Sequence, residues 1–413
     1  MCPAHAHRAS SGPGERFGRS AADRFGRPGL LASGRWVAGV LAGLAVLVAA
    51  GMLLLWPARH PRLTATGAER LSGQLVAGTV RSSQAVDCAG AGAGCRTSVQ
   101  VLVTSGPDAP TVITLSFTPG PTDPRLRVGD RIRLARAVQS GQVLYQFDDI
   151  QRDRPLLVLG LIFAVVVLAV GRWRGLAALV GLVFAGAVLV AFLIPALVAG
   201  SSPILVAVLA GAAITLVVLP LSHGVSLTTG IAMLGTLSGM AAAAGLAEIS
   251  LASLRITGLS SEEYATLTLQ GSHSTVGGLL LAGAVIGALG VLNDVTVTQA
   301  AAVAELAAGG TRPRSVLASA MRIGRDHIAS TVYSLVLAYA GSALPLLLLF
   351  SLSQQSTTDV LTSDSLAPEI AISLIGGIAL VLVVPLTTAL AATISRPRRP
   401  APIAGRSQPA TAA

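Results

Sequence analysis

The stretch of chain between residues 156 and 197 decides the fold. It reads LLVLGLIFAVVVLAV (156–170), GRWRG (171–175) and LAALVGLVFAGAVLVAFLIPAL (176–197). Two apolar runs that carry no charge thus flank a short basic segment. A helix needs about 20 apolar residues to cross the hydrocarbon core of a bilayer, and an uncharged run of that kind is the usual signal of a span. The stretch therefore predicts two transmembrane helices joined by a short loop.

The same signal recurs along the chain, which has 413 residues, of which 52% are hydrophobic and only 12% charged. A soluble protein with so few charged residues could not cover all of these runs with polar surface. Together with the two runs above, the sequence predicts a polytopic α-helical membrane protein with about eight transmembrane helices. The other six runs are 37–56, 204–221, 231–246, 276–292, 328–350 and 370–394.

The positive charges predict the orientation. All 29 basic residues are arginine, and the formal net charge is +10. The arginines cluster in both tails and in alternate loops, and they form no aromatic-interleaved stripe, which argues against nucleic acid as a partner. Arg172 and Arg174 in one loop, and Arg312 and Arg314 in another, fall on the side of the N-terminal tail. Because cytoplasmic loops carry the excess of basic residues, we predict a plasma-membrane protein with both termini cytoplasmic.

The segment between the first two spans has a different pattern. Alternating apolar and polar residues occur at 74–80, 99–103, 112–117, 127–134 and 143–147, separated by Gly, Pro and Asp. This pattern predicts five strands and a small extracytoplasmic all-β, OB-like domain. The predicted domains are a disordered tail (1–36), the first transmembrane helix (37–56), the extracytoplasmic β-domain (57–154), a seven-helix transmembrane domain (155–394) and a second disordered tail (395–413).

Two of the three cysteines, Cys88 and Cys95, lie in the β segment and are separated by six Ala and Gly residues. Thiols oxidise outside the cytoplasm, which favours a disulfide between them, and two free thiols are the alternative. The chain has no Cys/His spacing typical of a metal site and no phosphate-binding loop. We therefore predict neither a metal nor a cofactor.

A polar stretch that begins at Asp294 and continues to Glu305 follows the predicted span 276–292. In a helix, Asp294, Thr298 and Glu305 fall on one face, because eleven residues complete about three turns. Their carboxylates and hydroxyl, with the neighbouring amide of Gln299, would suit a path for protons, a cation or a small substrate. In the alternative interpretation, Asp294 caps a short interfacial helix after a break at Gly290. Both interpretations stay open.

A second polar cluster, Arg325, Asp326 and His327, leads directly into the next predicted span. His327 is the side chain whose charge changes most readily near neutral pH, which favours a functional role. Successive residues of a helix point about 100° apart, so the three side chains do not by themselves form a catalytic triad. The alternative, a charged collar at the membrane interface, is the commoner case.

The motifs GALGVLNDVTVTQ (287–299) and IGRDHIASTV (323–332) closely resemble the YibE/F-like membrane proteins, as do GRWRG (171–175) and LVLAYAG (335–341). The resemblance covers roughly residues 71–350. It implies an integral membrane protein and brings no established substrate. The family pattern has Asp at the position of Asn293, and this difference removes one carboxylate of a paired-carboxylate ion site.

Three functions follow from these observations. The first is a secondary transporter or permease that moves a small molecule or an ion past a polar intramembrane site near Asp294. The second is a non-catalytic assembly factor that binds a membrane protein or another partner through its β-domain. The third, an intramembrane enzyme using Asp294, Asp326 and His327, ranks last because the chain has no recognisable nucleophile motif. We therefore expect no catalytic residue and, beyond the lipid bilayer, a substrate or a membrane protein as partner.

Overall fold

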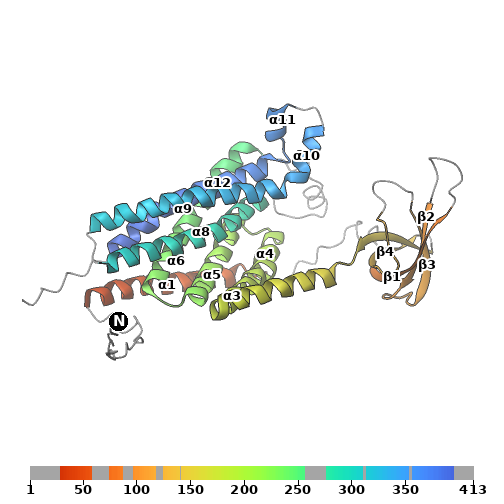
Figure 1. Ribbon diagram of the computed structural model, residues 1–413, viewed down its shortest axis with the longest axis horizontal. Coiled ribbons are helices and arrows are strands. Elements are labelled where there is room, and N and C mark those ends of the chain that lie inside the picture. Colours follow the sequence, from red (N-terminus) through yellow and green to blue (C-terminus); the bar gives the residue numbers. More distant parts are fainter. Residues whose placement is uncertain are drawn as a thin grey trace, which may run out of the picture.

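Helices make up most of the computed structural model, which describes residues 28–57, 74–86, 96–117, 124–139, 141–255, 276–309, 313–352 and 356–394. Figure 1 shows these helices gathered in a bundle, with a separate β-domain beyond one end of α3. Cys88, Cys95 and the residues at 1–27 and 395–413 lie outside the described residues. The disulfide and the disordered tails therefore stay predictions.

The β-domain is one antiparallel sheet with the strand order β3-β2-β1-β4-β5. Each of the five predicted segments overlaps one strand. The fourth strand begins at Arg131 and not at residue 127, because Val128 and Gly129 form a turn and Gly129 has a φ of +93°. The strands are β1 (Gln74–Val86), β2 (Arg96–Val103), β3 (Thr111–Phe117), β4 (Arg131–Gln139) and β5 (Gln142–Ile150).

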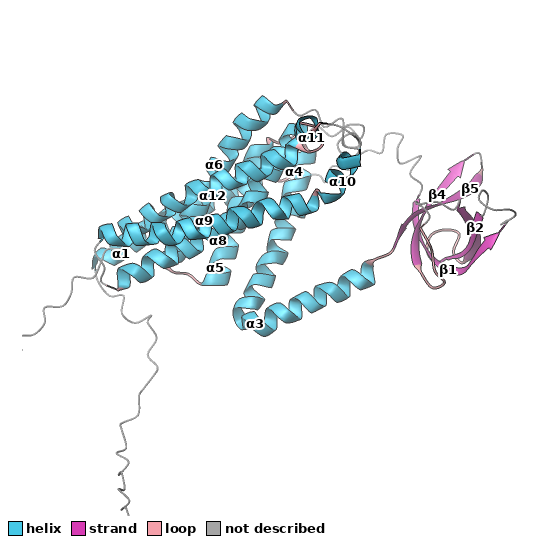
Figure 2. Ribbon diagram, turned by 45° about the horizontal axis from the view of Figure 1, so that its top comes forward, coloured by secondary structure: helices cyan, strands magenta, loops and turns pink. Residues whose placement is uncertain are grey.

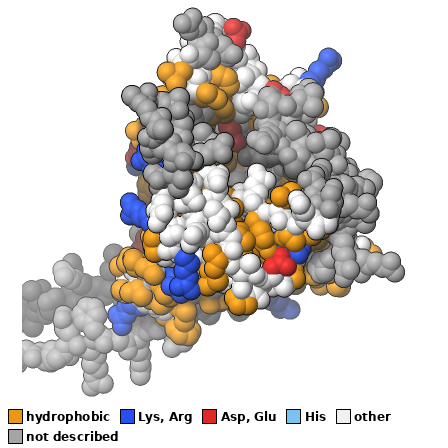
Figure 3. Space-filling view, turned by 90° about the vertical axis from the view of Figure 1, so that its right-hand side faces the viewer, with side chains coloured by type: hydrophobic (Ala, Val, Ile, Leu, Met, Phe, Trp, Pro, Cys, Tyr) orange, Lys and Arg blue, Asp and Glu red, His pale blue; other side chains and the backbone are white. Residues whose placement is uncertain are grey.

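The sheet curls around a small apolar core that includes Val80, Val101 and Leu134. Strands β3 and β5 are the two edges of the described sheet, so the domain is a half-barrel. The closed, OB-like form stays a prediction. Figure 3, which views the molecule from the side of this domain, shows arginine side chains around exposed apolar surface.

One ion pair joins the strand pair β4–β5 to the loop before β3. Asp108 accepts hydrogen bonds from the Arg136 guanidinium and from the Tyr145 hydroxyl. The hydrogen bond from Arg136, with a smaller contribution from Tyr145, lowers the pKa of Asp108 below its ordinary value. A lowered folded-state pKa stabilises the fold above the unfolded-state pKa of about 3.9, and this stabilisation is lost as the pH falls through the folded-state pKa.

We therefore expect the β-domain of the full chain to resist pepsin at about pH 5 and to be cleaved within residues 96–150 at about pH 3. Asp108→Asn should already be cleaved at the higher pH, because it lacks the charge that Arg136 stabilises. Mass spectrometry of the fragments measures the difference. Asp148→Asn is the control, since Asp148 only pairs with Arg133 at 3.5 Å on the surface. Equal cleavage of the two variants would contradict the assignment.

A two-residue link connects the sheet to the bundle. The backbone N–H of Gln151 donates to the carbonyl oxygen of Arg131 (2.7 Å), and Arg131 pairs with Asp153 (3.2 Å). Arg152 pairs in turn with Asp149 (2.8 Å). These contacts hold the link against β4 and β5, and the Arg131–Asp153 pair joins β4 to the first turn of α3.

Helix α3 (Asp153–Val188) contains the GRWRG segment and is kinked there. Arg172 has a φ of +51°, outside helical geometry, and divides α3 into two arms that Figure 2 shows at a sharp angle. A Cβ at Gly175 would overlap the carbonyl oxygen of Val167, so the turn needs glycine at this position. The arm before the kink is apolar and exposed on nearly every side.

Six helices of the described chain are long and apolar enough to cross a membrane, or seven if α9 and α10 form one bent span. The sequence predicted eight, and α3 with its continuation into α4 counts here as one helix in spite of its kink. Besides α3, the helical segments are α1 (Pro28–Leu54), η2 (Leu189–Leu193), α4 (Ile194–Val198), α5 (Pro203–His223), α6 (Leu227–Leu254), α8 (Val276–Ala308), α9 (Pro313–Ser342), α10 (Leu344–Leu352), α11 (Thr357–Leu361) and α12 (Ala367–Ile394).

The predicted span at 328–350 is interrupted. Helix α9 ends at Ser342 and α10 begins at Leu344, with a bend of 61° between them. Pro345 lies in the first turn of α10, where its missing N–H costs no helical hydrogen bond, whereas a continuous helix would lose one there.

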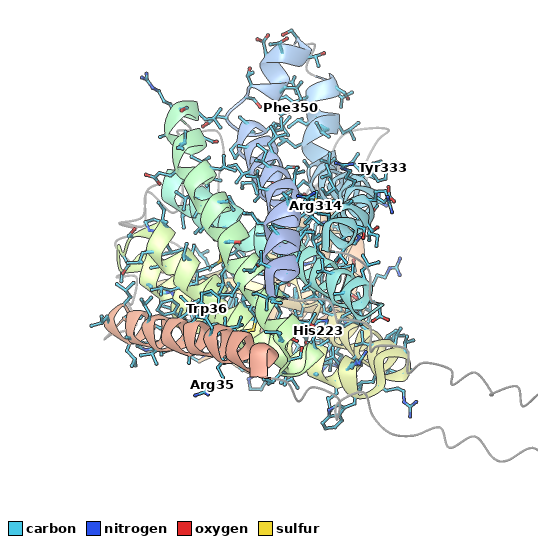
Figure 4. All side chains as sticks on the ribbon, turned by 90° about the vertical axis from the view of Figure 1, so that its left-hand side faces the viewer. Arg35, Trp36, His223, Arg314, Tyr333 and Phe350 are labelled. Carbon is cyan, nitrogen blue, oxygen red and sulfur yellow. The ribbon has the colours of Figure 1, made fainter. Side chains whose placement is uncertain are left out.

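Helix α8 lies at the centre of the bundle and packs against α5, α6, α9 and α12. The start of α1 and the end of α12 lie at the same end of the bundle in Figure 1. Figure 4 views that end, where Arg35, His223 and Arg314 lie on α1, α5 and α9. Gly239 allows α6 to approach Leu292 of α8 and Val383 of α12 closely. Gly235 and Gly239, one turn apart on α6, thus both lie at helix contacts.

Candidate functional site

The polar stretch of α8 lies inside one continuous helix, Val276–Ala308. Asp294 therefore does not cap a separate helix, and there is no break at Gly290. Asp294, Thr298 and Glu305 fall on one face of α8, as the spacing predicts, and all three are exposed. The Thr298 hydroxyl donates to the backbone carbonyl of Asp294 (2.9 Å). The carboxylate of Asp294 is thus left for a partner outside α8.

That partner is His327 of α9, whose Nε2 lies 3.7 Å from Asp294 Oδ2. The side chain of Asp294 is 71% exposed, and that of His327 is 29% exposed. His327 Nε2 is itself buried and has no hydrogen-bond partner among the described residues. The structure therefore brings these two predicted site residues together, whereas Glu305 lies eleven residues further along α8 and does not join them.

Arg325 and Asp326 are exposed, and neither has an ion-pair partner within the part of the chain that the structure describes. The guanidinium of Arg322, one turn before Asp326, donates to Ser319 Oγ (3.1 Å) and not to Asp326. The charged cluster near the middle of α9 thus joins the Asp294 site only through His327.

Gln299 faces the opposite way from Asp294, into the centre of the bundle, where it is 2% exposed. Its amide nitrogen donates to the backbone oxygen of Ala320 in α9 (2.8 Å) and to Thr388 Oγ1 in α12 (2.7 Å). Gly324 faces this amide, and a Cβ there would lie 3.0 Å from Gln299 Oε1. Gln299 therefore links three helices and does not belong to the exposed stripe.

The interior holds further polar side chains that the sequence did not predict. Thr236 of α6 and Thr296 of α8 share a hydrogen bond of 2.7 Å, and both are fully buried. Thr387 of α12 is fully buried next to Gly235, and its hydroxyl has no hydrogen-bond partner among the residues that the structure describes. We refer to Thr236, Thr296, Gln299, Thr387 and Thr388 as the polar core. Single threonines in three apolar helices give no local signal, so only packing reveals them.

The polar core lies well inside the helical bundle. Gly230 of α6 contacts Val37 and Leu41, which begin the apolar run of α1. From Gly230 to Thr236, α6 rises about 9 Å. The polar core therefore lies about 9 Å deeper in the bundle than the start of the first apolar run.

Oxygen atoms dominate the chemistry of the polar core. Thr387 Oγ1 is unpaired, and so is Oδ1 of Asn293, one turn before Thr296. An unpaired buried oxygen costs free energy in a packed interior, which singles out these two atoms. Within the described ranges, no three His, Cys, Asp or Glu side chains are grouped as metal ligands. The arrangement offers neutral oxygens and one carboxylate–imidazole pair.

Two surface hollows lie elsewhere. One, at the junction of the sheet and α3, is lined by Arg131, Arg133, Asp149 and Arg152. The other lies between α5, α6 and α8, beside Glu248. Neither hollow is lined by a residue of the polar core.

Comparison with known proteins gives one match. A family model described as YibE/F-like protein matches residues 159–397, which is more than half of the chain. The match covers most of α3 and every later helix through α12, and the β-domain lies outside it. No curated protein and no solved structure matches significantly.

Proposed function

We propose that this chain, which belongs to the YibE/F-like family, is a secondary transporter or permease of the plasma membrane. The transported species would be an ion or a small polar solute. Its path would pass the polar core and the Asp294–His327 pair. The family itself assigns no substrate, so the proposal rests on the side chains of the bundle.

The proposal includes eight crossings with both termini cytoplasmic. The kink at Arg172 supports two crossings within α3 and α4, and the bend after Ser342 supports one broken crossing by α9 and α10. The remaining crossings are α1, α5, α6, α8 and α12. This arrangement puts Arg172 and Arg314 on one side of the membrane, as the excess of basic residues in cytoplasmic loops favours.

One observation supports transport above the other functions: the unpaired Thr387 hydroxyl in a fully buried position at the contact of α6, α8 and α12. Threonine in a helix readily donates to the carbonyl four residues earlier, as Thr388 does to Val384. An oxygen that forgoes this bond inside an apolar bundle is available to a passing cation, water or solute. Asp294 and His327 would supply the proton or charge exchange.

Thr387→Val provides the test. Valine fills the same space without an oxygen, and removing an unpaired buried hydroxyl should leave stability equal or higher. We expect proteoliposomes with the unaltered chain to move protons when a Na⁺ or K⁺ gradient is applied, as measured with an internal pH-sensitive dye. Thr387→Val and Asp294→Asn should each lower this flux by about tenfold or more, equivalent to about 1.4 kcal/mol.

Asp359→Asn is the matched control, because the Asp359 carboxylate only accepts a hydrogen bond from the Ser356 hydroxyl in the connection before α12, where the Asp359 backbone N–H donates back to Ser356 Oγ. It should retain the flux of the unaltered chain. The proposal would be refuted if proteoliposomes with the unaltered chain show no more flux than protein-free liposomes. It would also be refuted if Thr387→Val retains full flux.

The charged hollow beside β5 favours the second candidate function, binding of a partner by the β-domain. Arg131, Arg133 and Arg152 line it at the base of the sheet. Cross-linking of the intact chain in cells, compared with a chain that lacks residues 74–150, would test it. A partner captured equally by both chains would exclude a role for the β-domain.

A further inference from the structure

One side of α9 is both polar and uncovered. Its exposed residues include Arg322, Asp326, Ser330, Tyr333 and Ser334, which recur at helical spacing and which we name the α9 outer face. Figure 4 shows Tyr333 at the outer edge of the bundle. The opposite side of α9 carries Ala320, Gly324 and Leu335, which are buried against the bundle. Helix α9 thus has one side buried against the bundle and one exposed side that carries these polar residues.

The α9 outer face lies at the depth of the polar core. His327, the neighbour of Asp326, faces Asp294, and Asp294 is two residues from Thr296 in α8. Given the membrane placement of the proposed function, on which this inference rests, Asp326 lies inside the bilayer. An ionised side chain at this depth is costly in contact with lipid and needs a charged or hydrogen-bonding partner.

The described residues do not supply that partner. Asp326 has no ion-pair partner among the described residues, and the Arg322 guanidinium donates only to the exposed Ser319 hydroxyl. Arg322 and Asp326 are four residues apart on the same face, so this face carries one base and one acid about 6 Å apart along the helix axis. Such a face is complementary to a second copy of itself.

We propose that the α9 outer face is the interface of a homodimer, in which two copies meet about a twofold axis along the membrane normal. That axis places equal depths of the two α9 helices side by side, and each interface contact occurs twice. Because Arg322 and Asp326 differ in depth by about 6 Å, the long Arg322 side chain of each copy then extends along the interface to Asp326 of the other. Ser330 and Ser334 lack bulk and let the two helices approach closely.

Such a dimer also covers the exposed Asp294–His327 pair. Asp294 lies on the α8 surface beside this face, with 71% of its side chain exposed. A second copy would remove it from lipid contact and enclose it between two bundles. Lipid alone offers no counter-charge to Arg322 and Asp326 at this depth, which is why we favour a second copy of the chain as the occupant.

Cysteine cross-linking in native membranes tests the interface. Ser330→Cys should give a covalent dimer on oxidation that reductant reverses, at least about fivefold more than the unaltered chain, whose Cys2, Cys88 and Cys95 set the background. Leu386→Cys is the matched control, since Leu386 is an exposed residue of α12 beside Thr387, away from the α9 outer face. Equal cross-linking of the two variants, or none in Ser330→Cys, would overturn the proposal.

A charge exchange tests the pairing itself. Arg322→Asp and Asp326→Arg should each reduce the dimer fraction in lipid nanodiscs by about tenfold, because each places like charges opposite one another. The double variant with both changes restores opposite charges and should restore the dimer. Single variants that remain fully dimeric, or a double variant that stays monomeric, would overturn the pairing. The dimer fraction is measured without a transport assay. Failure of the dimer proposal can therefore be distinguished from failure of the proposed function.

Discussion

Gly235→Leu is expected to abolish recovery of folded protein. A Cβ at Gly235 would overlap Thr387 Oγ1 and would lie 3.2 Å from Thr296 Cγ2. All three residues lie at the contact of α6, α8 and α12, where no flexible side-chain end can move away. Overpacking of a closed core by a small addition costs about 1–3 kcal/mol, and leucine adds four carbon atoms. The three helices would have to separate to accept it.

Fluorescence-detected size exclusion in detergent measures this effect, and we expect the monodisperse peak to fall by about tenfold or more. Gly235→Ala should fold with a melting temperature lower by about 5 °C, as expected for about 1–2 kcal/mol in a domain of this size. Gly245→Leu is the control on the same helix, because a Cβ there meets nothing within 4 Å. If Gly245→Leu is as damaging as Gly235→Leu, the close contact is not the cause.

Gln299→Glu is expected to be nearly as damaging, although the two side chains have the same shape. The carboxylate would lie in a site that is 2% exposed and would face the Ala320 carbonyl, to which Gln299 now donates at 2.8 Å. An uncompensated buried charge costs about 3–5 kcal/mol, so we expect little folded protein at neutral pH. Acidification should restore folding, because a protonated carboxyl can donate as the amide does.

Gln299→Leu separates charge from hydrogen bonding. It loses two donated bonds, and bonds of this kind within membranes are worth about 0.6 kcal/mol each, so the loss is about 1 kcal/mol. Thr388 keeps its own bond to Val384 (2.6 Å) and is not left unpaired. Thermal unfolding in detergent should rank the unaltered chain, Gln299→Leu and Gln299→Glu in that order. If Gln299→Leu and Gln299→Glu unfold at the same temperature, Gln299 contributes only its hydrogen bonds and the site tolerates a charge.

The sequence predicted the elements because their signals are local. An uncharged apolar run such as 204–221 lies inside α5 (Pro203–His223), and the alternation at 112–117 lies inside β3 (Thr111–Phe117). Breaks were harder to predict. The bend after Ser342 lies within an unbroken apolar run, and only the position of Pro345 distinguishes it.

The candidate site was predicted less well, because the direction of a side chain depends on neighbours far along the chain. Asp294 and Gln299 are five residues apart and were assigned to one site, yet one faces outward and the other inward. Thr387 was not predicted at all, since its unpaired hydroxyl becomes apparent only beside Gly235 of α6. The pairing of His327 with Asp294 likewise requires the packing of α9 on α8.

The link between β5 and α3 has a mechanical consequence. Ion pairs flank Gln151, and one of them, Arg131–Asp153, connects the sheet to the first turn of α3. That arm is exposed along its length, so few neighbours in the bundle resist its rotation. A torque applied to the β-domain, for example by a bound partner, would therefore travel along α3 as along a lever. Its fulcrum is the tight turn at Arg172 and Gly175, at the far end of this arm from the β-domain.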